Sequence, residues 1–498
     1  MKRQSGILMP IFSLPSEYGI GDFGKTSYKF IDFLKDSGQK LWQVLPLVQT
    51  GFGNSPYSSV SSKSFNPYFI SVEGLYKDGL ISLEQLNSAQ CQSIYIDYEF
   101  LYNSRFSLLR VAFDNFDTNE KGFKKFVKAG EYFDYAMFMA IKHKNGQKDF
   151  IYWQNGLKKR NKKSLEKFYK QNEKEVLFWQ FVQYRGQLEW QSLKKYANQN
   201  GIKIIGDIPL YVALDSVDVW VNPKLFKLNK NYIPTKVAGV PPDYFCQDGQ
   251  LWGNPVYDYS KHQKDKFSWW VNRIKTCLKH FDYLRIDHFR GLDRYYEINY
   301  GEQTARNGEW IDVPHDKLFK ILHQNIDKRK IIAEDLGIID DGVKDLIKDT
   351  GYPGMKILSF AFNGEKDNLY LPENIIENSV CFTGTHDNDT LLGLISNCSD
   401  WDYNNLINGV KESLAKANIS LPITDSSSLV DAMVELGFYT KSKMFIMPFA
   451  DVIKCDTSYR INEPGSIKQT NWSVRFSKEQ FSEYAKQKLL YLTKKYNR

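Results

Sequence analysis

The chain has few cysteines and few histidines, and neither residue type forms a motif. Six cysteines are spread over 498 residues, with no Cys-x-x-Cys pair and no histidine at the spacing of a zinc site. This scatter excludes a small disulfide-stapled scaffold and is typical of a reduced, cytoplasmic protein. Because the whole chain has seven histidines, it also offers little for a metal site in which several imidazoles converge.

Long apolar runs are missing as well. No stretch reaches the ~18 apolar residues that a membrane span requires. At the N-terminus, Lys2 and Arg3 precede a short apolar run that loosely imitates a secretory leader. Pro10 and Glu17 interrupt this pattern, and no small-residue cleavage site follows. We therefore expect a cytoplasmic protein that begins here and has no membrane partner.

The composition that remains is that of a large folded protein. It is 42% hydrophobic and 25% charged, and it contains 11 Trp, 31 Tyr and 33 Phe. Such a chain can bury a core, so disorder is excluded. The length permits about three domains of ~150 residues, or one barrel enlarged by insertions.

The net charge of +8 is concentrated in one region. Residues 121–170 contain fourteen Lys or Arg and four Asp or Glu, so this region carries +10 and the rest of the chain sums to −2. The densest part, Lys158 to Lys163, is typical of a solvated surface between helices and is less suggestive of a phosphate-binding patch. No nucleic-acid-binding motif is present, and we expect no nucleic-acid partner.

Short apolar runs alternate with helical patterns, which indicates β-α units. Eight such runs favour a closed parallel barrel, a (β/α)8 TIM barrel, over an open sheet. The helix predicted before the fourth run is the clearest, because residues from Phe267 to Phe281 form a single apolar stripe. The predicted strands cover residues 40–47, 66–72, 202–211, 283–288, 330–334, 355–360, 380–385 and 444–449.

The spacing of these runs predicts large insertions between the strands. About 125 residues separate the second run from the third, too many for one crossover helix. We therefore expect a first part of the barrel at 1–75, a mainly helical insertion at 76–200 and the remainder of the barrel at 201–498. A proline-bearing excursion at about 212–262 is interpreted as an ordered loop region near the active site.

Polar residues stand where four of the apolar runs stop, which is where parallel barrels place reacting groups. Asp207 ends the third run, and Arg285, Asp287 and His288 belong to the fourth. The other two runs end in Glu334-Asp335 and in His386-Asp387-Asn388-Asp389. A single such carboxylate would usually be a helix cap, but four motifs at four strand ends indicate one pocket.

The spacing suggests separate roles for the carboxylates. Arg285 and Asp287 are two apart on a strand and share a face, so the guanidinium should lower the pKa of Asp287 and hold it ionised as a nucleophile. Desolvation and nearby carboxylates should raise the pKa of a general acid across the pocket. Alternation admits only one of Glu334 and Asp335 to the interior, and the pattern does not say which.

Other chemistries find less support in these residues. A metal site would use His288, His386, Asp387 and Asp389, but metal-dependent barrel hydrolases usually need several converging histidines. No Gly-x-Ser-x-Gly elbow and no Walker loop occurs. We therefore expect no metal and no cofactor.

In these and further motifs, the sequence resembles the 4-α-glucanotransferases of the amylomaltase (disproportionating enzyme) family. This is glycoside hydrolase family 77 of the wider α-amylase group. The resemblance covers nearly the whole chain, while residues 76–200 carry few of its marks. Its motifs are Gly19-Ile20-Gly21-Asp22, Trp42-Gln43-Val44-Leu45-Pro46-Leu47, Ser55-Pro56-Tyr57-Ser58, Gly206-Asp207-Ile208-Pro209, the stretches 239–245 and 249–255, the carboxylate motifs, Asn462-Glu463-Pro464-Gly465 and Asn471-Trp472.

The resemblance implies a role for each matching residue. It makes Asp287 the nucleophile, Glu334 the acid/base and Asp387 the stabiliser of the transition state, and so favours Glu334 over Asp335. The substrate-binding residues that it implies are Tyr57, Asp207, Arg285, His386, Asp243, Gln250, Trp252, His288, Ser55 and Asn462. Of these, Asp243, Gln250 and Trp252 lie on what resembles the family's mobile active-site loop.

The implied reaction is retaining transfer of α-1,4-glucan segments between maltooligosaccharides and glucose, through a covalent glucosyl-enzyme. Aromatic side chains suit a sugar pocket that discourages water, and Tyr57, Tyr244, Phe245 and Trp252 are candidates. The alternatives are a hydrolytic α-glucosidase or amylase of the same group and, more remotely, a non-catalytic glucan-binding protein. We expect a monomer or a homodimer.

Overall fold

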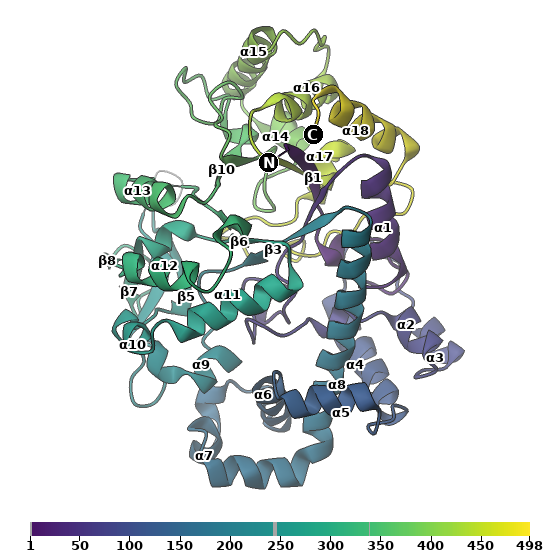
Figure 1. Ribbon diagram of the computed structural model, residues 1–498, viewed down its shortest axis with the longest axis vertical. Coiled ribbons are helices and arrows are strands. Elements are labelled where there is room, and N and C mark those ends of the chain that lie inside the picture. Colours follow the sequence, from purple (N-terminus) through teal and green to yellow (C-terminus); the bar gives the residue numbers. More distant parts are fainter. Residues whose placement is uncertain (1, 243–246, 338) are drawn as a thin grey trace.

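The computed structural model is built around an eight-stranded parallel sheet with helices outside it (Figure 1). The structure describes residues 2–242, 247–337 and 339–498. Neighbouring strands follow the order β10-β11-β12-β1-β2-β3-β6-β9. Their bounds are β1 Gln4–Leu8, β2 Leu41–Gln43, β3 Lys203–Ile208, β6 Tyr283–Ile286, β9 Ile331–Ala333, β10 Gly354–Ile357, β11 Ser379–Phe382 and β12 Met444–Pro448.

The sheet closes on itself between the two strands at the ends of this order. The Ala333 N–H, at the end of β9, donates to the carbonyl of Pro353, which precedes β10, at 3.0 Å. The Met355 N–H donates to Asp335 Oδ1 at 2.6 Å, so a side chain completes the seam. The predicted (β/α)8 TIM barrel is therefore confirmed.

Burial on both faces explains why the strands are continuous apolar runs instead of alternating ones. All five residues of β12 are buried, as are all four of β11. Helix α11, Ser268–His280, covers the barrel with Trp270, Ile274 and Cys277, as its predicted stripe requires. The other helices around the barrel are α1 Lys25–Asp36, α2 Val72–Lys77, α9 Val217–Val221, α10 Tyr259–Lys264, α12 His315–His323, α13 Asp341–Thr350, α14 Leu391–Asn397, α15 Asp400–Lys416, α16 Ser426–Tyr439, α17 Phe449–Val452 and α18 Glu483–Lys495.

One of the eight predicted strands is wrong. Residues 66–72 form no strand: the Asn66 side chain caps a 3-10 helix at Pro67–Phe69, and α2 starts at Val72. Proline at the first helical position fixes a helical φ and provides no N–H for a ladder. The eighth strand is instead β1, in the apolar N-terminal run, where it pairs with β12 and β2.

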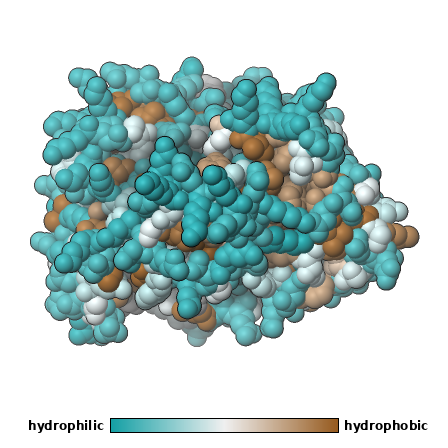
Figure 2. Space-filling view, turned by 90° about the horizontal axis from the view of Figure 1, so that it is seen from below, coloured by the Kyte–Doolittle hydropathy of each residue, from teal (hydrophilic) through white to brown (hydrophobic). Residues whose placement is uncertain are grey.

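Residues 76–200 contain six α-helices that extend away from the barrel at the bottom of Figure 1. The long helix α8 packs against α6 and also reaches α1 and β3, which joins this region to the barrel. Seen from below, this side of the molecule is largely hydrophilic (Figure 2). The bounds are α3 Leu83–Ser88, α4 Tyr98–Asp114, α5 Lys121–Ala129, α6 Phe133–Lys144, α7 Asn155–Lys158 and α8 Lys162–Gln199.

A second, antiparallel sheet in the order β5-β4-β7-β8 was not predicted from the sequence. Two of its strands lie in the region 212–262, which was interpreted as a loop region. Strands β5 and β8 carry mainly exposed and half-buried residues, so they lack the apolar run that marks the barrel strands. The bounds are β4 Lys236–Val240, β5 Gln250–Pro255, β7 Arg294–Asn299 and β8 Gly308–Asp312.

No helix of the described residues is long and apolar enough to cross a membrane. Each of the five cysteines in the described part is free: Cys91, Cys277, Cys381, Cys398 and Cys455.

Candidate active site

The carboxyl ends of neighbouring strands bring the predicted polar residues together. Strand β3 lies beside β6, and their register places Asp207 opposite Arg285. Strand β6 lies in turn beside β9, whose last residue Ala333 precedes Glu334. The segment after β11 contributes His386 and Asp387. The parallel order of the barrel thus gathers residues that are far apart in the sequence at one end.

Arg285 is the cation around which this site is arranged. It is 3% exposed, and its Nη1 donates to both carboxylate oxygens of Asp207 at 2.9 and 2.8 Å. The same nitrogen lies 2.9 Å from Asp287 Oδ1. A buried guanidinium between two carboxylates holds both at fixed positions, because leaving any one of these charges unpaired is costly.

The expectation that Asp287 has a lowered pKa is wrong. Burial raises the pKa of Asp287 well above its usual value, and Arg285 only partly opposes this effect. Asp207, Glu334 and Asp387 raise the pKa further, since each adds negative charge nearby. The sequence analysis considered the arginine but could not show how far the surrounding strands and carboxylates oppose its effect.

Glu334 points into the pocket and Asp335 does not. The Glu334 carboxylate accepts N–H groups from His288 at 2.6 Å and from Leu336 at 2.9 Å. Asp335 accepts the Met355 N–H at the barrel seam and lies 3.6 Å from Lys356. Burial raises the pKa of Glu334, while Arg285 and the two N–H groups oppose the rise. The pKa of Glu334 is therefore raised, as the sequence analysis expected.

Tyr57, His386 and Asn462 form the wall next to Asp387. The Tyr57 ring stacks on the His386 ring, with centroids 5.1 Å apart, and its hydroxyl donates to Asp207 Oδ2 at 2.6 Å. Asn462 Nδ2 donates to Asp387 Oδ1 at 2.7 Å, and its N–H donates to the His386 carbonyl. Burial lowers the pKa of His386, so the ring is neutral at pH 7.

Trp252 and His288 form a second wall. The Trp252 ring meets the His288 ring edge to face at 4.8 Å, and its Nε1 donates to Gln250 Oε1 at 3.1 Å. His288 has a left-handed backbone, with φ 49°, in which its N–H reaches Glu334. Trp252 is 36% exposed, so much of its indole remains free to contact a ligand.

Two predicted residues stand apart from these contacts. The Ser55 hydroxyl accepts the Tyr57 N–H at 3.2 Å and so shapes the turn that carries Tyr57. Asp243, with the neighbouring Tyr244 and Phe245, lies outside the described residues.

The sequence reasoning missed Arg460. Its Nη2 donates to the Asp387 carbonyl at 2.9 Å, and its Nε donates to the Asn462 carbonyl at 2.8 Å. The guanidinium thereby ties the segment around Asp387 to the one around Asn462. The only signal in the sequence was its position two residues before the Asn462 motif.

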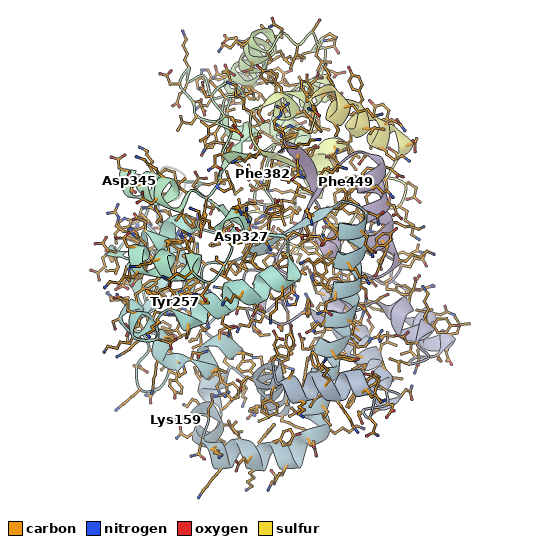
Figure 3. The ribbon with its side chains drawn as sticks, in the orientation of Figure 1. Lys159, Tyr257, Asp327, Asp345, Phe382 and Phe449 are labelled. Carbon is orange, nitrogen blue, oxygen red and sulfur yellow. The ribbon has the colours of Figure 1, made fainter. Side chains whose placement is uncertain are left out.

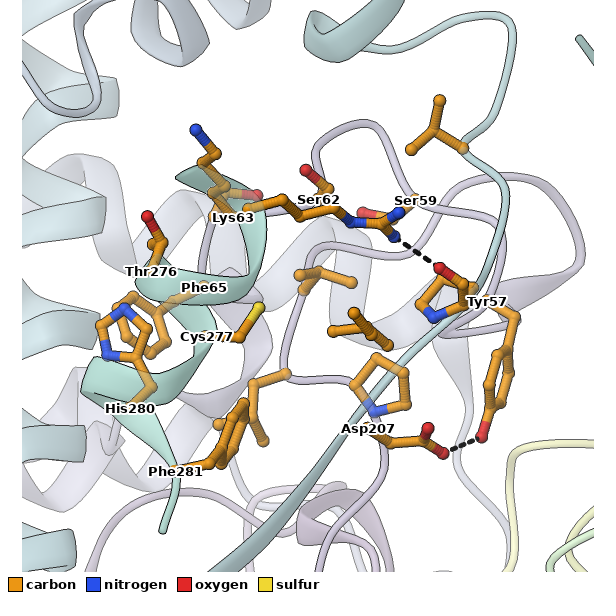
Figure 4. Close-up of a pocket in the computed structure, with 18 of the residues that line it drawn as sticks. Tyr57, Ser59, Ser62, Lys63, Phe65, Asp207, Thr276, Cys277, His280 and Phe281 are labelled. Atoms are coloured by element: carbon orange, nitrogen blue, oxygen red, sulfur yellow. Dashed lines mark hydrogen bonds between the residues drawn. The ribbon is translucent and has the colours of Figure 1, made fainter. Parts of the chain in front are cut away.

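A cavity of about 40 Å³ lies behind Asp207 and Tyr57 (Figure 4). Helix α11 forms one side with Thr276, Cys277 and His280, and the walls are mainly apolar. In Figure 4, the Tyr57 hydroxyl reaches Asp207 at the edge of this cavity.

Within the described residues, no group of three or more His, Cys, Asp or Glu side chains is arranged to hold a metal ion. The chemistry that the described groups offer is proton transfer and nucleophilic attack by Asp287 and Glu334 beside a buried cation. Neutral rings and hydrogen-bonding groups line the rest of the site, which suits a polar, uncharged ligand.

Comparisons with known proteins find relatives that match nearly the whole chain. Residues 9–480 match the family model described as 4-alpha-glucanotransferase. A 4-alpha-glucanotransferase of Clostridium butyricum is 41% identical over 98% of this chain and 100% of its own length. One from a Synechocystis strain is 39% identical over 100% of this chain and 98% of its own. Among solved structures, an amylomaltase from Streptococcus agalactiae in complex with acarbose covers both chains completely, with 36% identity and a TM-score of 0.94.

Proposed function

The chain belongs to the 4-alpha-glucanotransferase family, and from this premise we propose how it moves α-1,4-glucan segments. The donor is a maltooligosaccharide, and the acceptor is the 4-hydroxyl of glucose or of another glucan. The observation that carries the proposal is the 2.9 Å contact between Arg285 and Asp287, beside the buried Glu334. A nucleophile fixed by a cation and an acid kept out of water are what retaining transfer requires.

In the first step, Asp287 attacks the anomeric carbon of the donor and forms a covalent ester. Glu334 gives its proton to the glycosidic oxygen, so the bond to the leaving sugar breaks and that sugar departs with its hydroxyl intact. In the second step, Glu334 takes the proton of the acceptor 4-hydroxyl, which attacks the same carbon and releases Asp287. The two carboxyl groups should then lie about 5–5.5 Å apart.

This chemistry needs one proton shared by Asp287 and Glu334. Burial raises the pKa of both groups, and the negative charge of Glu334 raises the pKa of Asp287 further. The proton must be on Glu334 when the donor is bound. The contact between Arg285 and Asp287 favours that distribution, since it stabilises the charge on Asp287.

The remaining residues hold the sugars. Asp387 would grip hydroxyl groups of the donor sugar and stabilise the transition state, while Arg285, Asp207, Tyr57 and His386 surround the same ring. The exposed face of Trp252 suits the C–H groups of a second pyranose. Binding roles for Gln250, Asp243, His288, Ser55 and Asn462 complete the proposal.

Chromatography of a maltotriose incubation tests this function. We expect glucose together with maltooligosaccharides longer than the substrate, and no activity in Asp287→Asn. Products that are all shorter than maltotriose would identify a hydrolase instead. No conversion by the wild type would favour a binding protein.

We also propose a cytoplasmic location and a monomer or homodimer. The five free cysteines of the described chain are compatible with a reducing compartment. Fractionation of the source cells and light scattering of the purified protein test these two points.

A further inference from the structure

Asp451 is a buried carboxylate that the proposed mechanism does not use. It lies on α17, directly after β12, and is 1% exposed. No ion pair among the described residues includes Asp451. Burying a carboxylate without a cation usually costs several kcal/mol, so the hydrogen bonds of Asp451 must offset this cost.

Those bonds attach both ends of one segment. Asp451 Oδ2 accepts the Thr383 hydroxyl at 2.6 Å, and Oδ1 accepts the Leu391 N–H at 2.8 Å. Thr383 directly follows β11, and Leu391 is the first residue of α14. Figure 3 labels Phe382, which precedes Thr383, and Phe449, the first residue of α17. One carboxylate therefore closes the segment 383–391 at its base.

The segment closed in this way carries His386 and Asp387. Inside it, Asn388 Oδ1 accepts the Thr385 N–H at 2.7 Å, and the Thr385 hydroxyl accepts the Asp387 N–H at 3.2 Å. These local bonds fix the shape of the segment but do not attach it to the barrel. At its tip, Arg460 and Asn462 hold Asp387 from one side. At the opposite end, Thr383 has backbone hydrogen bonds with Ile446 and Ser359, and Asp451 adds the two side-chain bonds that join this end to the start of α14.

We propose that Asp451 is a positioning residue of the transfer reaction, which sets the place of the Asp387 carboxylate and the His386 ring relative to the donor sugar. This inference rests on the role proposed above for Asp387. Displacements of about 1 Å in such groups are enough to lower rates substantially, because their interactions strengthen only in the transition state.

Three variants separate positioning from mere stability. Asp451→Leu keeps a side chain of similar size but removes both hydrogen bonds, and we expect kcat to fall at least 30-fold while KM changes less than threefold. Asp451→Asn can keep both bonds, since its amide oxygen accepts the Leu391 N–H and its NH2 donates to the Thr383 hydroxyl. We expect it to retain kcat within about fivefold. Thr383→Val tests the same contact from the other side, should Asp451→Leu fail to fold.

Asp282 provides the matched control. Its Oδ2 also accepts one N–H and one side-chain donor, from Ile204 and Asn198 at 2.9 Å each, but it lies before β6 at the amino ends of the strands. Asp282→Leu should lose stability yet keep the kcat of the folded protein. All rates are referred to folded protein, measured by circular dichroism.

The inference is overturned if folded Asp451→Leu or Thr383→Val keeps wild-type kcat, if Asp451→Asn is as impaired as Asp451→Leu, or if Asp282→Leu loses kcat equally. Asp387→Asn distinguishes this failure from failure of the proposed roles. If Asp387→Asn is fully active, the role of Asp387 is wrong. If it is inactive while folded Asp451→Leu remains active, only the positioning role is wrong.

Discussion

Replacing Arg285 should shift the pH dependence of transfer to higher pH. In Arg285→Met, Asp287 loses a cation 2.9 Å from its Oδ1. At an effective dielectric constant of about 20, this attraction is worth about 6 kcal/mol, which is an upper limit. The Asp287 side chain is 28% exposed, so water screens part of the effect, and we expect the loss of this cation to raise the pKa of Asp287 further.

The pH profile shifts because the protonation state of Asp287 changes. A higher pKa leaves the Asp287–Glu334 pair with an extra proton at neutral pH, and a protonated Asp287 does not attack. Removing one partner of a buried charge pair costs about 2–5 kcal/mol, so kcat at pH 7 should fall by roughly 30- to 5,000-fold. Activity should recover partly as the pH is raised.

The assay is glucose release from maltotriose between pH 5 and 9. Arg273→Met is the matched control, because Arg273 is fully buried and its guanidinium donates to the backbone carbonyls of Leu210 and Pro209 instead of to a carboxylate. It should lose stability without moving the acid limb of the profile. An Arg285→Met enzyme whose acid limb coincides with that of the wild type would refute the electrostatic reasoning.

Further predictions concern stability and the wall of the site. At about 24 cal/mol per Å³, the 40 Å³ cavity costs about 1 kcal/mol, so Cys277→Val should raise the free energy of unfolding in urea by up to that amount. Cys381→Val, at a fully buried cysteine outside the cavity lining, should lower it. Burial raises the pKa of Asp451 to about 6, so its contribution to stability is full below pH 3.8 and is lost as the pH rises through 6. The stability of Asp451→Asn relative to the wild type should therefore grow by up to about 3 kcal/mol from pH 4 to pH 8, and an unchanged difference would contradict this pKa. Tyr57→Phe loses the bond to Asp207 but keeps its ring, and kcat/KM should fall about tenfold, far less than in Tyr57→Ala.

The barrel could be predicted from the sequence because its strands are buried on both faces. Runs such as 444–449 are apolar throughout, and the polar residues that follow them mark the catalytic end. Strand β1 was missed because it is five residues long and follows two basic residues, which imitates a leader. The prediction of a strand at 66–72 was wrong because the aromatic and aliphatic residues there fit a strand, whereas Pro67 does not.

The sequence predicted which strand-end residues share the site, but it did not predict the burial and hydrogen bonds that set their properties. Arg285 and Asp287 share a motif, but the degree of burial that raises the pKa of Asp287 depends on strands from the entire chain. No pattern in the sequence pointed to Asp451, because its hydrogen-bond partners are 68 and 60 residues away. The choice between Glu334 and Asp335 likewise required the barrel seam, where Asp335 binds the Met355 N–H.

The covalent ester on Asp287 is the central claim, and mass spectrometry of the intact Glu334→Gln protein tests it most directly. With maltotriosyl fluoride as donor, the first step needs no acid because fluoride is a good leaving group, while the second step lacks its base. We predict that the protein becomes heavier by one maltotriosyl group and that peptide mapping locates this group on Asp287. The added mass should be missing in the Asp287→Asn, Glu334→Gln double variant. An adduct on another residue, or consumption of the fluoride with no adduct, would contradict it.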